Sequence, residues 1–118
     1  MSLLSQPLRP RYVFGIDDRV IWQGFLEELV RNAKWKISVH VRNDICDGRV
    51  SQLEINRLKS LEQWYVWALE LGSEDATLEK PKPKFLLRYP SPDPDKWQIT
   101  AVVAIMEPLL IITIYPKS

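Results

Sequence analysis

The sequence predicts a single α+β domain, in which two amphipathic helices pack on an antiparallel sheet of about four strands in the order α-β-α-β-β-β. Three observations lead to this fold class: an apolar stripe of helical period near the N-terminus, a second such stripe in the middle of the chain, and three apolar segments of strand length at the C-terminal end. The length of 118 residues suits one domain, and 46% apolar with 26% charged residues is ordinary for a globular protein. We therefore expect residues 1–118 to share one core.

The first element predicted is a helix that follows an irregular N-terminal arm of residues 1–16. Asp17 and Asp18 offer an N-cap, and two carboxylates suit the positive end of a helix dipole. The apolar residues of segment 20–33 recur at steps of three and four residues, which is typical of a helix with one buried stripe.

The second element predicted is a half-buried strand, because the period changes to two at Trp35. Apolar residues alternate with polar ones as far as Arg42, and this alternation puts His40 and Arg42 on the polar face. Residues 43–48 contain Asn-Asp and Asp-Gly pairs, which favour a turn.

A second helix is predicted from Ser51 to Leu71. Ser51 and Glu54 fit a capping box, and Gly72 stands where a helix C-cap glycine is expected. Three further apolar residues widen the stripe of this helix: Trp64, Trp67 and Leu71. An apolar face this broad indicates a second contact, within the fold or with another chain, so these three residues are the predicted partner-binding surface.

After a surface loop over residues 73–83, three strands are predicted: Phe85 to Tyr89, Trp97 to Met106 and Leu109 to Tyr115. The last two are apolar on both faces, as strands covered on both sides of a sheet are. Two helices can cover one face. The other face must be covered by the N-terminal arm, by one of the helices or by a second subunit, and we favour a homodimer.

Several classes of function are excluded by composition. The four glycines form no phosphate-binding loop and no dinucleotide fingerprint, and one histidine with one cysteine rules out the common His/Cys metal sites. We therefore expect no cofactor and no metal. The longest apolar stretch is too short to cross a bilayer, and a lone cysteine favours a reducing, cytoplasmic setting. The net charge of +1 gives no general attraction to nucleic acid.

His40, the only histidine, would carry any acid–base chemistry. A cluster of His40, Arg42, Arg88 and Thr113 would suit metal-independent cleavage of RNA, with His40 taking the 2′-hydroxyl proton and the arginines stabilising charge on phosphorus. The simpler interpretation is that His40 is a surface residue on a solvated strand face.

Segment 97–116, Trp-Gln-Ile-Thr-Ala-Val-Val-Ala-Ile-Met-Glu-Pro-Leu-Leu-Ile-Ile-Thr-Ile-Tyr-Pro, resembles the C-terminal hairpin of small RelE/barnase-like toxin domains. The resemblance implies a ribonuclease of toxin–antitoxin type, with Thr113 and Arg88 on active-site strands and His40 in the acid–base role. This chain differs from that family because its predicted fold has a strand between the two helices.

The function expected from the sequence is a non-enzymatic protein-interaction or regulatory domain, such as an accessory or immunity-type protein. Near-neutral charge and few polar groups at the sheet centre favour this over catalysis. The expected partner is another protein or a second copy of the chain. A nucleic-acid partner belongs to the ribonuclease alternative.

Overall fold

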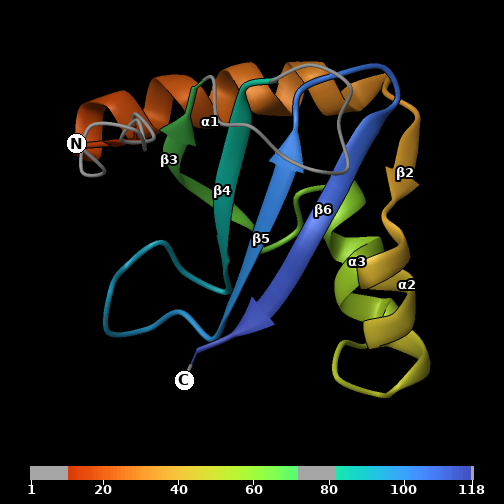
Figure 1. The fold of residues 1–118 in the computed structure, drawn as a ribbon. Coiled ribbons are helices and arrows are strands. Elements are labelled where there is room, and N and C mark those ends of the chain that lie inside the picture. The colour runs from red at the N-terminus through yellow and green to blue at the C-terminus, as the bar shows by residue number, and fades with distance from the viewer. Residues whose placement is uncertain (1–10, 72–81, 118) are drawn as a thin grey trace, which may run out of the picture.

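The computed structural model describes residues 11–71 and 82–117 (Figure 1). The chain folds as β1 (Arg11–Val13), α1 (Ile16–Arg31), β2 (Trp35–Ile37), α2 (Val39–Cys46), α3 (Gln52–Lys59), β3 (Tyr65–Glu70), β4 (Lys84–Tyr89), β5 (Ile99–Ala104) and β6 (Leu109–Pro116). The α+β class is as predicted. The described residues hold three helices and six strands, where the sequence indicated two helices and about four strands.

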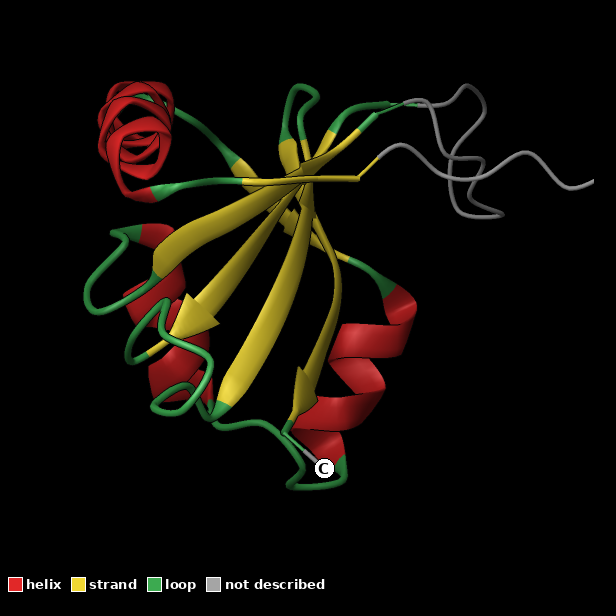
Figure 2. Cartoon of the chain, turned by 90° about the vertical axis from the view of Figure 1, so that its left-hand side faces the viewer, coloured by secondary structure: helices red, strands yellow, loops and turns green. Residues whose placement is uncertain are grey.

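The six strands form one mixed sheet in the order β1-β3-β4-β5-β6-β2. β2 runs parallel to β6, so the prediction of an entirely antiparallel sheet is wrong at this edge, and the other neighbouring pairs are antiparallel. Strands β3 to β6 follow one another in the chain and in space, so the centre of the sheet is a simple antiparallel meander. Figure 1 shows α1 running across one end of the sheet, and Figure 2 shows the twist of the sheet with the other two helices toward its opposite end.

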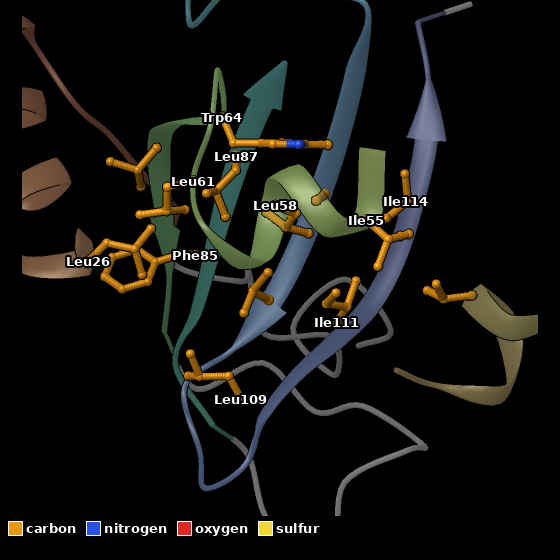
Figure 3. Close-up of a cluster of buried hydrophobic side chains, with 14 of the residues drawn as sticks. Leu26, Ile55, Leu58, Leu61, Trp64, Phe85, Leu87, Leu109, Ile111 and Ile114 are labelled. Carbon is orange, nitrogen blue, oxygen red and sulfur yellow. The ribbon is translucent and has the colours of Figure 1, made fainter. Parts of the chain in front are cut away.

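The main core lies between one face of the sheet and the three helices, each of which contributes at least one buried side chain. It joins Leu26 of α1 and Leu58 of α3 to Phe85 and Leu87 of β4 and Ile111 of β6 (Figure 3). These side chains alternate with residues that point to the opposite face, because successive residues of a strand project to opposite sides. The opposite face, called the second face below, therefore carries Arg88 of β4.

The N-terminal region is more regular than expected. Residues 11–13 form β1, which pairs with β3, and α1 begins at Ile16 with Gly15 as its N-cap. Asp17 and Asp18 lie in the first turn of α1, where they still suit the helix dipole. The rest of the predicted arm lies outside the described residues.

The strand predicted from Trp35 to Arg42 is correct only as far as Ile37. Ser38 stops it, since the Ser38 hydroxyl accepts a hydrogen bond from the Val41 amide at 3.1 Å and donates one to the Ile112 carbonyl at 2.7 Å. The first bond caps α2, and the second fixes that cap to β6. α2 then lies beside the lower half of β6 (Figure 1).

The helix predicted from Ser51 to Leu71 is wrong beyond Lys59. Its start is as expected, because the Ser51 hydroxyl accepts from the Glu54 amide at 3.2 Å. A turn with Leu61 and Gln63 at positive φ (59° and 61°) then leads into β3. Aromatic and β-branched residues favour a strand there, and pairing with β4 stabilises it. The predicted cap residue Gly72 and most of the predicted loop 73–83 lie outside the described residues.

The three C-terminal strands agree with the prediction to within two or three residues at each end. The burial on both faces that was predicted for the last two strands also agrees. Besides the main core, Ala104, Leu110 and Ile112 form a small buried cluster on the second face. Within the described part of the chain, no helix contributes a side chain to this cluster.

Candidate functional site

His40 and Arg42 lie on α2 and not on a strand, so the predicted strand-face placement of both residues is wrong. The His40 side chain is exposed, and its Nε2 lies 3.6 Å from Asp44 Oδ2, one helical turn away. Arg49 Nη1 approaches the other oxygen of the same carboxylate at 3.7 Å. His40 therefore lies in a polar cluster with Asp44 and Arg49 at one side of the sheet.

Arg88 and Thr113 project from the second face, as the ribonuclease hypothesis requires. Arg88 is opposite Thr100 on β5, whereas Thr113 is opposite Val102, so the two lie in different rows of the sheet. The structure thus brings Arg88 and Thr113 to one sheet face and leaves His40 and Arg42 on the helix beside β6.

The three residues predicted to bind a partner do not form an exposed patch. Trp64 is fully buried, its indole N–H donates to the Glu54 carbonyl at 3.2 Å, and its ring centroid lies 5.2 Å from that of Tyr89. The prediction that Trp64 is exposed is wrong, because the segment that contains it is a turn against α3 and not a helix. Trp67 is half-buried in β3, and Leu71 is half-buried against the main core.

An exposed apolar surface lies instead on α1 and β1, and we call it the α1 surface. Six large apolar side chains on it are between 51% and 74% exposed: Tyr12, Val13, Ile16, Val20, Ile21 and Phe25. Val13 projects to the opposite face of β1 from Tyr12, whereas Ile16, Val20, Ile21 and Phe25 are all on α1. Several exposed apolar side chains on one helix indicate an interaction site. The sequence predicted that the apolar residues of α1 form one buried stripe. The helical period identified these residues correctly, but half of them are exposed.

α1 faces outward because a few contacts hold it at the end of the sheet. Only Leu26 of this helix is fully buried. The Gln23 amide donates to the Trp64 carbonyl at 3.1 Å, and its oxygen accepts from the Val66 amide at 2.8 Å. Trp22 stacks on Phe14 with ring centroids 5.5 Å apart. Because these contacts use one side of α1, its other side is exposed in the part of the chain that the structure describes.

A cleft of about 540 Å³ opens beside the α1 surface, between β1 and the start of α1. Its lining is formed by Arg11, Tyr12, Val13, Phe14, Asp18, Trp22 and Leu69. Apolar rings with one basic and one acidic side chain are a lining that a protein side chain can fill.

The outermost line of α1 is charged at both ends. Asp17, Gly24 and Arg31 are seven residues apart and all exposed, and seven residues make almost two helical turns. Arg31 also pairs with Glu28 within the helix, at 3.1 Å. The line is therefore acidic at its start, free of a side chain at its middle and basic at its last residue.

On the second face, Arg88 lies between two indole rings. Its guanidinium carbon is 3.8 Å from the centre of the Trp67 ring and 4.9 Å from that of Trp97, and its Nη1 donates to the Pro92 carbonyl at 3.1 Å. Burial lowers the pKa of Arg88, and the nearby Tyr115 raises it in part. An arginine keeps its proton in proteins, so this face holds a fixed positive charge between aromatic rings.

Within residues 11–71 and 82–117, no three His, Cys, Asp or Glu side chains gather as metal ligands would. None of the helices in these ranges has the length and hydropathy needed to span a bilayer. Comparisons with models of protein families, with curated proteins and with solved structures give no significant match to this chain. The RelE/barnase-like resemblance is thus neither supported nor opposed by a relative.

Proposed function

We propose that this protein is a non-enzymatic interaction domain that pairs with a second copy of itself through α1. The observation that carries the proposal is the α1 surface, where four large apolar side chains of one helix are at least half exposed. Burying apolar surface is the main favourable term in protein association, at about 25 cal/mol per Å².

The charges of α1 favour a second copy as the partner. In an antiparallel pair of α1 helices centred on Gly24, Asp17 of one copy is opposite Arg31 of the other, and the symmetry repeats this contact at the other end. A parallel pair would put like charges side by side. The helix is therefore complementary to itself in one orientation only.

The middle of the pair also suits close approach. Gly24 presents no side chain, and a Cβ built there meets nothing within 4 Å, so two helix backbones can approach at this point. Val20 and Ile21 lie one turn before it and are exposed, and they would be the first apolar side chains buried.

Sedimentation velocity over a wide range of protein concentration tests the proposal. The wild-type protein is expected to form dimers. Asp17→Arg places two arginines opposite each other and Arg31→Asp places two aspartates opposite each other, so each variant alone should dimerise about tenfold more weakly. An equimolar mixture of the two variants should recover dimers, because both contacts in the mixed dimer join opposite charges.

Two controls separate pairing from folding. A double variant that carries Asp17→Arg and Arg31→Asp in the same chain should dimerise like the wild type, because opposite charges still face each other. Its new charges are unfavourable to the helix dipole at both ends of α1. Gly24→Gln should raise the stability of the monomer, because glycine costs about 1 kcal/mol in a helix interior, and it should abolish the dimer. A wild-type protein that stays monomeric, or a mixture that recovers nothing, contradicts the proposal.

The ribonuclease alternative has less support. The chain has one histidine, and this residue is on α2, paired with Asp44, rather than on the sheet face of Arg88 and Thr113. An RNA-degradation assay that compares the wild type with His40→Ala decides it. Cleavage that is lost in the variant would favour the nuclease over the interaction domain.

A further inference from the structure

We propose that the second face binds single-stranded nucleic acid, with bases stacked on Tyr65 and Tyr115 and a phosphate held at Arg88. This goes beyond self-association and uses different residues. The register of the sheet, the surroundings of Arg88 and the exposure of the two tyrosines support it.

The register puts four side chains in one row across β3, β4, β5 and β6. Tyr65 is opposite Arg88, Arg88 is opposite Thr100, and Thr100 is opposite Tyr115. Residues directly opposite each other in antiparallel strands project to the same face. The neighbours of this row along each strand, such as Val66 and Ile114, are in the main core, so the row itself faces the other way.

The two ends of the row are open. Tyr65 is 38% exposed and Tyr115 is 42% exposed. They are three strand spacings apart, which is about 14 Å. Two exposed rings on one sheet face, with a cation between them, are the elements by which proteins bind unpaired bases and the backbone that joins them.

Arg88 is fixed for such a contact before any ligand arrives. The Trp67 and Trp97 rings flank it, and the Pro92 carbonyl accepts from its Nη1. Its Nε is buried and has no hydrogen-bond partner in the described structure, and the same is true of the Trp67 indole nitrogen. These two nitrogens are closed to solvent, so neither can bond a ligand directly. Arg88 as a whole is partly exposed, so a phosphate would bind its remaining N–H groups.

A second cation extends the site toward the C-terminus. Lys117 Nζ lies 5.1 Å from the centre of the Trp97 ring and donates to the Pro94 carbonyl at 2.8 Å. Cation and ring thus alternate from Trp67 through Arg88 and Trp97 to Lys117. A bound strand that crosses the row from β3 to β6 would have a positive charge near its middle and another near its end.

Fluorescence anisotropy with labelled decauridylate and decathymidylate at low salt tests the proposal. The wild type is expected to bind both oligonucleotides. Tyr65→Ala and Tyr115→Ala should each weaken binding about fivefold or more, because stacking is worth about 1–3 kcal/mol per base. Tyr65→Phe and Tyr115→Phe keep the rings and should bind like the wild type. Lys117→Ala should reduce the slope of log affinity against log salt concentration by about one unit, because one phosphate contact is lost.

The controls distinguish stacking from charge alone. Lys59→Ala removes a cation from α3, away from the row, and should leave affinity unchanged. Polyglutamate of matched length carries charge without bases and should not compete. Absence of wild-type binding at low salt, wild-type affinity in both tyrosine-to-alanine variants, or equal competition by polyglutamate overturns the proposal. Circular dichroism of each variant confirms that it is folded, so a loss of binding is not a loss of structure.

Discussion

At the residue scale, single hydroxyls and backbone angles decide where the elements begin and end. The period-two pattern of residues 35–42 continues past Ser38, yet the strand does not. The Ser38 hydroxyl satisfies one amide of α2 and one carbonyl of β6, and a strand through Ser38 would lose the first of these bonds. Side-chain capping of this kind competes with strand pairing. The spacing of apolar residues contains no information about such capping, so it did not predict the end of the strand.

Ser38→Ala should therefore destabilise the protein more than Ser51→Ala. Both serines cap a helix, but Ser38 is buried and makes a second bond to the Ile112 carbonyl, whereas Ser51 is exposed and makes the cap alone. We expect losses of about 2 kcal/mol and about 1 kcal/mol in the free energy of unfolding, measured in urea. Equal losses would mean that the bond to β6 adds nothing.

At the element scale, the strands that the sequence predicted well are those with the longest apolar runs. β5 and β6 are buried on both faces, so neither needs an alternating pattern to be recognised. β3 was not predicted because its apolar residues neither form a long run nor alternate regularly. A bulge between Val66 and Ala68 disturbs its alternation, and the apolar spacing across the Leu61 turn matches a helix by coincidence. No local pattern separates a continued helix from a turn and a bulged strand in this segment.

The attachment of α1 rests on Gln23 more than on any other polar residue of that helix, and Gln23→Ala tests this. The change leaves the Val66 amide and the Trp64 carbonyl without their side-chain partner, and Val66 is fully buried. We expect the free energy of unfolding to fall by about 2 kcal/mol. Gln52→Ala removes an exposed side chain that bonds only Asn56, and it should change stability by less than about 0.5 kcal/mol. A similar small loss in both variants would contradict this account of the helix.

At the scale of the whole molecule, the two proposed surfaces differ in how far sequence could find them. The sequence grouped Arg88 and Thr113 in one hypothetical cluster with His40, and the strand register places Arg88 and Thr113 on one face without His40. Tyr65 could not be added to that face, because its segment was predicted as a helix. The α1 surface depends on how α1 is docked against β3, which is a long-range property, so the sequence showed its residues and not their exposure.

Self-association has a consequence for the stability of the whole molecule. If the folded chain is a dimer, unfolding also dissociates it, so its melting temperature depends on protein concentration. Each tenfold increase in concentration should add about 1.4 kcal/mol per dimer to the free energy of unfolding and raise the melting temperature of the wild type. Gly24→Gln should melt at one temperature throughout, and at low concentration it should melt above the wild type, because the substitution favours the helix while removing the pairing. Differential scanning calorimetry at several concentrations measures both effects. A wild-type melting temperature that does not change with concentration would show that the α1 surface stays exposed in solution.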